Sequence, residues 1–271
     1  MIIQSNYGEV SQFFMGKEIN GNVLYSMAVY YVDGLLIDTG PKTVMNEAQS
    51  IFQDIQVEKV VNTHHHEDHI GNNLSFQEKR IPIFAHELAV PLINDPSQWI
   101  SRLLDYQKLI WGTPSASISN PLGDSIESNN YKFKVIHTPG HSADHICLLE
   151  EKNGWLFSGD LFLGEKVKLL RNDEDVHLSM ASLTKLLDYE FDTIFCGSGR
   201  VFDNAKQRVN EKLSWWQGLY RQIVQMEKQG YDAPVIRTKL LGEENAFAQL
   251  TGGAISKLNL IQSFLSSLPN E

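Results

Sequence analysis

The sequence is poor in cysteine, in positive charge and in long apolar runs. Its only two cysteines, Cys147 and Cys196, form no metal-spaced pair, which argues against a disulfide framework or a cysteine-ligated zinc site. No apolar run approaches the roughly 20 residues of a membrane span, and the first residues lack a signal-peptide pattern. We therefore expect a cytoplasmic protein without a membrane partner.

Negative charge dominates, since 33 acidic residues stand against 23 basic ones and give a formal net charge of −10 at pH 7. Unspecific binding to nucleic acids depends on positive charge, so a nucleic-acid partner is disfavoured, although a local basic patch remains possible. We expect a small-molecule substrate as the main partner. Composition leaves the oligomeric state open, and a dimer is among the possibilities.

Patterns typical of strands precede patterns typical of helices twice along the chain. The first half has β-prone stretches at 9–15, 22–32 and 34–38, with turns at Asn20-Gly21 and Asp33-Gly34, and then a helix that places Val44, Ala48, Ile51 and Phe52 on one face. The second half has strands at 131–136, 145–150 and 154–158, a helix at 178–188 and the strand Thr193–Cys196. Two such halves, packed sheet against sheet, predict an α+β fold in the form of a four-layer αββα sandwich.

The last quarter of the chain has a different pattern. Asp203 can cap a long helix whose apolar stripe stops at Gly230, and another helix is expected at about 254–268. We predict a domain at 1–202 and a C-terminal helical appendage at 203–271. Trp215 and Trp216 in the long helix are expected in the core or in an interface.

The segment 93–120 has no clean period. It holds Trp99 and Trp111 together with several serines and prolines. Long segments of this kind are either lids over a site or packing, and the sequence favours neither.

The most informative segment is Thr63-His64-His65-His66-Glu67-Asp68-His69, which follows an apolar run at 57–61 that is typical of a buried strand. Side chains alternate along an extended chain, so His64 and His66 point to the same side and can share one cation. Neutral imidazole is a common ligand for zinc and similar ions. Asp68 and His69 lie where the chain turns and can reach a second cation. The alternative is a solvated polar turn.

Four further polar pieces each follow an apolar strand. They contain Asp38, His141, Asp160 and the loop Cys196-Gly197-Ser198-Gly199-Arg200. If the strands run side by side, their ends converge on one edge of the sandwich, where loops carry ligands on a rigid frame.

The order and spacing of these pieces resemble the metallo-β-lactamase superfamily of metal-dependent hydrolases over residues 15–205. The stretches His64–His69 and Thr138–His141 are the most specific parts of the resemblance. The stretch His137–His145 and the later Ser158-Gly159-Asp160 are most similar to the β-lactamase-like protein 2 branch.

The resemblance implies a two-metal site. His64, His66 and His141 would bind one cation, Asp68 and His69 a second, and Asp160 would bridge the two. Asp68 is also the expected catalytic residue, a water between the cations would be the nucleophile, and Asp38 would orient a ligand by a hydrogen bond. Zinc is the expected metal, while iron, manganese and nickel tolerate the same donors.

One position departs from the family pattern. Where the family has a last histidine that ligates the second metal, this chain has Ser198, whose neutral hydroxyl is a poor zinc ligand. We expect a well-occupied first site and a weaker or altered second one. The protein acts with one metal, recruits another ligand such as His177, or has lost much of its turnover.

Other polar residues near these motifs carry weaker predictions. His145 is interpreted as a residue that supports the ligands, and His65, His86 and His137 as structural. A group of basic residues either holds an anion or forms a solvated loop, and it consists of Lys166, Lys168, Arg171 and Arg200.

Three functions remain open at this stage. The leading hypothesis is a metal-dependent hydrolase acting on an ester-like, thioester, lactone or phosphoester substrate. The second is a ribonuclease or phosphodiesterase acting on single-stranded nucleic acid, as the branch suggests. The third is a metal-binding scaffold with reduced turnover because of Ser198.

Overall fold

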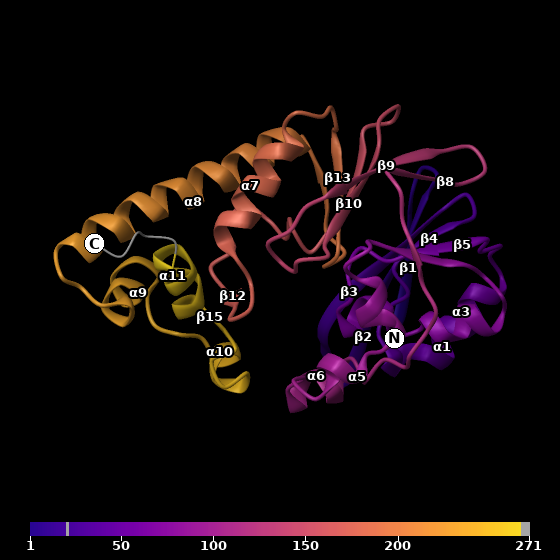
Figure 1. The fold of residues 1–271 in the computed structure, drawn as a ribbon, viewed down its shortest axis with the longest axis horizontal. Coiled ribbons are helices and arrows are strands. Elements are labelled where there is room, and N and C mark those ends of the chain that lie inside the picture. Colours follow the sequence, from indigo (N-terminus) through magenta and orange to yellow (C-terminus); the bar gives the residue numbers. More distant parts are fainter. Residues whose placement is uncertain (20–21, 267–271) are drawn as a thin grey trace.

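The computed structural model describes residues 1–19 and 22–266, so the expected turn Asn20-Gly21 and the end of the last expected helix lie outside the described residues. Two sheets stand face to face (Figure 1). The first has seven strands in chain order: β1 (Ile2–Tyr7), β2 (Val10–Ile19), β3 (Asn22–Val32), β4 (Leu35–Ile37), β5 (Lys59–Val61), β6 (Ile83–Ala85) and β7 (Asn120–Pro121). It is antiparallel from β1 to β4 and parallel from β4 to β7.

The second sheet has six strands in the spatial order β14-β13-β11-β10-β9-β8. Their bounds are β8 (Ser125–Glu127), β9 (Lys132–His137), β10 (Ile146–Glu150), β11 (Trp155–Gly159), β13 (Thr193–Cys196) and β14 (Val201–Asp203). A small antiparallel ribbon pairs β12 (Leu170–Arg171) with β15 (Ile255–Ser256).

An apolar layer joins the inner faces of the two sheets. Side chains such as Tyr30 and Val61 from the first sheet pack with Phe133, Leu148 and Phe157 from the second. Burial of this apolar surface is the main force that holds the sheets together.

Helices cover both outer faces. On the first sheet they are η1 (Lys42–Val44), α1 (Met45–Gln53) and α3 (Asn73–Glu78), with Phe52 and Phe76 buried against the strands. On the second sheet they are α7 (Val176–Leu186) and α8 (Ala205–Lys228). The predicted four-layer αββα sandwich is confirmed (Figure 1).

The C-terminal helices extend the molecule to one side (Figure 1). They are α9 (Ala233–Leu241), α10 (Ala246–Leu250) and α11 (Lys257–Leu265). The helices α9 and α11 share one apolar core with α7, α8 and the second sheet. Trp216 is buried in this core, and Trp215 packs against it, as expected. The domain boundary at 202 stays a prediction. Among the described residues, no helix is both long and apolar enough to cross a bilayer.

One local prediction is wrong, and one strand was not predicted. Asp203 does not cap the long helix, because it ends β14, and α8 begins after Asn204, a left-handed residue (φ 55°) that makes no side-chain cap. The strand β1 was not predicted, because four of its six residues are exposed and its apolar pattern is weak. The segment 93–120 begins at the end of the short helix α4 (Val90–Asn94). It contains two further short helices, α5 (Ser97–Ile100) and α6 (Asp105–Ile110).

Candidate metal centre

Loops that leave the strands meet at one edge of the sandwich. Backbone hydrogen bonds tie them together across the two sheets: Ile146 N donates to Thr63 O at 2.9 Å, and Ala28 N donates to Gly197 O at 2.7 Å. Within the second sheet, Gly197 N donates to Gly159 O at 2.7 Å. The loops that carry the predicted ligands are therefore held on a rigid frame.

Two groups of donor atoms form at this edge. Each group offers three atoms within 4.8 Å of one another, and the groups are His64, His66, His141 and His64, His69, Asp160. The imidazoles of His64 and His66 lie 4.5 Å apart between ring centroids, as their alternation along the chain predicted. The structure thus brings together five of the six residues predicted as ligands.

Asp68 is the sixth. It lies in the first turn of the short helix α2 (Glu67–Ile70), belongs to neither group, and has Oδ2 at 3.7 Å from His69 Nε2. It therefore lies beside the second group, and burial raises the pKa of its carboxyl.

The donor set fits a bound cation. The buried atoms His64 Nε2 and His69 Nε2 have no hydrogen-bond partner among the described residues, and an orphaned buried polar atom costs about 1–3 kcal/mol. Burial also lowers the pKa of His64 and His66, which favours the neutral imidazole that binds metals. Burial opposes the charged form of Asp160, yet His69 and His141 together hold its pKa below the usual range.

Asp38 anchors His69. It follows β4 in a left-handed conformation (φ 63°), and its Oδ2 accepts a hydrogen bond from His69 Nδ1 at 2.7 Å. The same carboxylate accepts from Thr63 N at 2.8 Å and Thr63 Oγ1 at 2.9 Å, so the ring of His69 is locked with Nε2 toward the site. Burial disfavours a charged His69, but Asp38, Asp68 and Asp160 raise its pKa.

His141 has a similar partner that sequence reasoning missed. Its Nδ1 lies 3.1 Å from Glu174 Oε1, which leaves Nε2 for the first donor group. Glu174 stands between Asp173 and Asp175, so the sequence indicated only a solvated charged loop. Glu174 reaches His141 only in the folded chain, so no pattern in the neighbouring sequence could have identified it as a partner of a predicted ligand.

His145 holds the backbone of Asp160 in place, which agrees with its interpretation as a residue that supports the ligands. Its Nε2 accepts a hydrogen bond from Asp160 N at 3.1 Å, and its Nδ1 lies 2.9 Å from Thr138 Oγ1. Burial lowers the pKa of His145 to about 3, so it stays neutral and can accept. Gly159 approaches so closely that a Cβ would lie 2.5 Å from His145 Nε2, which requires glycine here.

His65 points away from the donor groups and is held by Asp144. The carboxylate accepts from His65 N at 2.8 Å and lies 2.9 Å from His65 Nδ1. Burial would raise the pKa of Asp144, but its hydrogen bonds with His65 lower it to about 2. This pair fixes the backbone between the ligands His64 and His66.

The substitution Asp144→Asn is expected to lower the free energy of unfolding by about 2 kcal/mol at pH 7. Because the folded pKa lies below the unfolded value of about 4, the stabilisation is complete above that value and is lost as pH falls toward 2. Urea unfolding at pH 7 and at acidic pH measures it, with Asp124→Asn at an exposed position as control. A deficit that persists unchanged in acid would contradict this role.

Ser198 lies in the loop after β13, with Oγ at 3.1 Å from Cys196 Sγ. The neighbouring Gly197 packs so tightly that a Cβ would overlap Asp160 Oδ1, which places the loop directly beside Asp160. The structure does not bring His177 here, because its Nε2 lies 3.2 Å from Phe264 O and its ring packs on Tyr220.

We therefore expect Ser198→His to strengthen the second site. The new imidazole would add a donor beside Asp160, and the affinity for a second cation should rise by about tenfold or more. Metal counted per chain at increasing zinc concentration measures this, with Ser198→Asn as the matched polar control. Equal stoichiometry and equal hydrolysis in the two variants would show that Ser198 does not occupy a ligand position.

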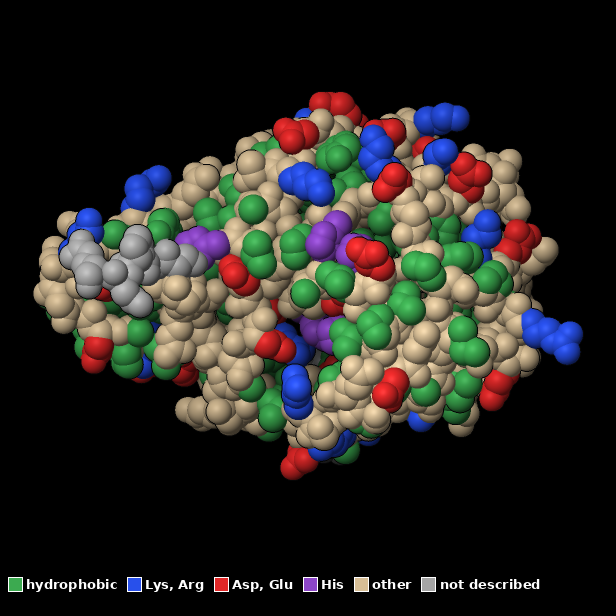
Figure 2. All heavy atoms as spheres, in the orientation of Figure 1, with side chains coloured by type: hydrophobic (Ala, Val, Ile, Leu, Met, Phe, Trp, Pro, Cys, Tyr) green, Lys and Arg blue, Asp and Glu red, His purple; other side chains and the backbone are tan. Residues whose placement is uncertain are grey.

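A cavity of about 360 Å³ adjoins both donor groups. Its walls are largely aliphatic around Leu161–Leu170. Tyr106, Trp111 and Phe247 of α10 also line it, and the rings of Tyr106 and Phe247 lie 6.0 Å apart. In Figure 2 the surface is hollowed near the middle of this face, where histidine, basic and acidic side chains lie close together. The segment 93–120 is thus both wall and packing, since Trp99 is buried.

Of the basic residues singled out in the sequence, Arg171 lines this cavity. Lys166 and Lys168 are exposed, and the Arg200 guanidinium lies 5.0 Å from the centre of the Phe202 ring. The cavity receives one basic residue that was not predicted, Lys212 from α8.

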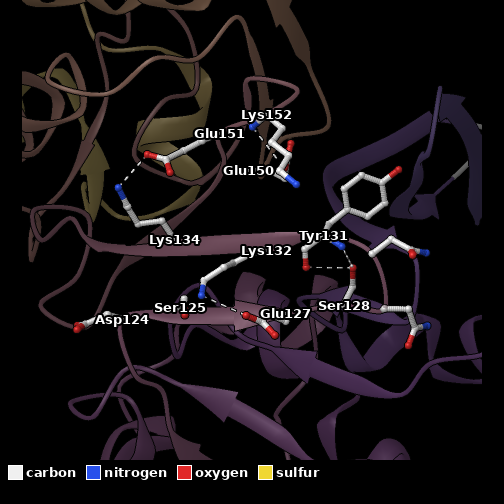
Figure 3. Close-up of a pocket in the computed structure, with 12 residues that line it drawn as sticks. Asp124, Ser125, Glu127, Ser128, Tyr131, Lys132, Lys134, Glu150, Glu151 and Lys152 are labelled. Atoms are coloured by element: carbon white, nitrogen blue, oxygen red, sulfur yellow. Dashed lines mark hydrogen bonds and ion pairs between the residues drawn. The ribbon is translucent and has the colours of Figure 1, made fainter.

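A second, open cavity of about 500 Å³ lies at the opposite end of β9 and β10 (Figure 3). Its charged side chains pair with one another, with Lys132 Nζ at 3.2 Å from Glu127 and Lys134 Nζ at 2.8 Å from Glu151. It contains none of the donor groups, so we place the site at the smaller cavity.

Known proteins are similar to this chain in sequence and in fold. The family model of the metallo-β-lactamase superfamily matches residues 24–198. The chain is 28% identical over 205 residues to a β-lactamase-like protein 2 homologue of Caenorhabditis elegans, covering 72% of this chain and 62% of the relative.

Several fungal relatives carry thioesterase names, and two of them illustrate the similarity. A thioesterase of Emericella nidulans is 25% identical over 82% of this chain and 57% of its own length, and an atrochrysone carboxyl ACP thioesterase of Aspergillus fumigatus is 28% identical over 50% and 39%. The chain spans less than two thirds of the length of these relatives.

Solved structures share the fold. A β-lactamase domain protein from Burkholderia ambifaria has a TM-score of 0.74 at 16% identity, covering 97% of this chain and 87% of that one. A metallo-β-lactamase family protein from Thermus thermophilus has 0.68 at 17%, covering 95% and 92%. The protein TTHA1623, solved in a di-iron-bound form, has 0.54 at 24%, covering 67% and 91%. Together with the motifs, these matches establish that the chain belongs to the metallo-β-lactamase superfamily.

Proposed function

We propose that this protein is a metal-dependent hydrolase of thioesters. The observation that carries the proposal is the largely apolar cavity that opens directly onto the two donor groups. Such a cavity suits an acyl chain, with its carbonyl carbon next to the cations. The two fungal relatives named as thioesterases support the same choice among ester-like, lactone and phosphoester substrates.

We propose zinc for the first donor group, because three imidazoles are a common ligand set for catalytic zinc. Iron is the second candidate, since TTHA1623 is known with two irons and imidazole suits both metals. When bound, the cations polarise the carbonyl and make a water a stronger nucleophile at neutral pH.

The protein's own residues position these groups and move protons. Asp38 and Glu174 fix the rings of His69 and His141 through their Nδ1 atoms. Asp68 lines the cavity, where its carboxylate receives the proton that the attacking water releases. The aromatic side chains around the cavity keep bulk water from the acyl part of the substrate.

The ribonuclease alternative has less support. Among the described residues that line the cavity, only Arg171 and Lys212 are basic, whereas four are acidic: Glu67, Asp68, Asp160 and Glu174. A groove for single-stranded nucleic acid needs a track of positive charge. The net charge of −10 points the same way.

A substrate panel with the metal-loaded protein tests the proposal. Medium-chain acyl thioesters, lactones, phosphodiesters and single-stranded RNA are compared with and without chelator, and metals are counted by elemental analysis. We expect thioester hydrolysis that a chelator abolishes and that zinc restores. Chelator-sensitive cleavage of RNA with intact thioesters would favour the ribonuclease, and a metal-loaded but inert protein would favour the scaffold.

A further inference from the structure

Lys212 is an anomaly in the apolar face of α8. The buried residues of this helix fall at helical spacing, Ala205, Val209, Leu213, Trp216, Leu219 and Ile223, and Lys212 stands among them with 2% of its surface exposed. A buried ammonium is costly unless it is paired and hydrogen-bonded. An aliphatic residue would pack here without that cost, so packing alone does not account for a lysine.

The ammonium of Lys212 forms no ion pair with any residue that the structure describes. Its Nζ donates to Leu161 O at 3.2 Å and lies 4.4 Å from the centre of the Trp216 ring. Among the described residues, no carboxylate oxygen lies within 4.0 Å of it. Arg171, the other basic residue of the cavity, is different, because its Nε is 3.0 Å from Asp173 Oδ1. Among the described residues, Lys212 is therefore the basic residue of the cavity without an ion pair, and Leu161 O engages one of its three N–H groups.

Lys212 also lies close to the reaction centre. Its hydrogen-bond acceptor, Leu161, is the residue after Asp160, and Lys212, Asp160 and His141 line the same cavity. A group bound to Nζ would be part of the molecule whose carbonyl lies at the donor groups. Burial lowers the pKa of Lys212 to about 8, although Glu174 raises it, so at neutral pH the ammonium form is available to an anion.

We propose that Lys212 binds a carboxylate of the substrate, so that the preferred substrates are acyl thioesters that carry an acid group on the acyl part. This inference rests on the proposed thioesterase function. One ammonium with two free N–H groups matches a single carboxylate. A phosphate carries more charge and needs several donors, and Glu174 would repel it more strongly than a singly charged carboxylate.

The test compares two thioesters of equal acyl length, one ending in a carboxylate and one in a methyl group. For binding, both are used as unreactive thioethers, and calorimetry follows them on the full chain with metals loaded and with metals chelated. We expect the acid-bearing probe to bind at least about tenfold more tightly than the methyl probe in both states.

Three variants assign that preference. Lys212→Met keeps the approximate length of the side chain and should remove the preference for the acid, so that the two probes bind with equal affinity, while the melting temperature stays equal or rises. Lys212→Arg should keep part of the preference. Lys206→Met is the matched control, because it removes a lysine of the same helix that pairs with Glu190 at the surface.

The outcomes separate this inference from the proposed function. Lys212-dependent binding of the acid probe without any thioester hydrolysis would retain the carboxylate site and reject the thioesterase. Equal binding of both probes by the unaltered chain would overturn the carboxylate site and leave the hydrolase standing. A preference that persists in Lys212→Met and disappears on chelation would show that the carboxylate binds the cations, which also overturns it.

Discussion

Replacing His66 by alanine is expected to remove the metal of the first donor group and nearly all hydrolysis. The donor atoms of His64, His66 and His141 lie within 4.8 Å of one another, and the two imidazoles left in the variant would hold a cation much more weakly than three. Affinity for the first cation should fall by more than about 100-fold, since even residues that only support ligands change it by about 10–100-fold. Hydrolysis should fall by at least about a thousandfold, because several kcal/mol of charge stabilisation are lost.

The adjacent His65 provides a matched control. Its ring faces Asp144 and belongs to neither donor group, and the bond from His65 N to Asp144 that fixes the backbone is kept in the variant. His65→Ala should therefore leave the metal content unchanged while lowering stability. Metal per chain by elemental analysis and the thioester rate are measured on both variants. Equal metal content in His66→Ala and the unaltered chain would remove His66 from the ligand set.

The parts of the fold that depend on local pattern were predictable. The alternation that places His64 and His66 together, and the apolar runs that become β5, β10 and β13, are written within a few residues of sequence. The edge strand β1 and the cap of α8 were not, because the first buries little and the second depends on the turn at Asn204. Edges and caps are set by tertiary neighbours.

The same distinction applies to the site. Five residues of the family motifs, from His64 to Asp160, bring donor atoms together at one edge, whereas Asp68 lies beside these groups and His64 belongs to both. Glu174 and Lys212 had no such signal, since one lies in a charged run and the other beside an apolar stripe. Their positions depend on how α7 and α8 pack against the loops, and a lysine at a buried helical position is the only trace that the sequence offered.

Asp160→Asn is expected to weaken both metal positions at once. One carboxylate oxygen lies 3.6 Å from His69 Nε2, and the other lies 3.6 Å from His141 Nε2, so Asp160 stands between the two groups of donors. The amide keeps the size of the side chain but removes the negative charge that draws two cations together. Both occupancies should fall by about tenfold or more, and hydrolysis by about a thousandfold.

Asp68→Asn is the comparison that distinguishes the loss of one metal from the loss of both. Asp68 lies next to His69 but in neither donor group, so its loss should reduce the second occupancy and the rate while the first metal stays bound. The metal-free protein is titrated with zinc, and the metal bound per chain shows whether a variant has lost one binding site or two. If Asp160→Asn loses only one metal, as Asp68→Asn does, Asp160 belongs to a single site, and the two donor groups would then act separately rather than as one bridged centre.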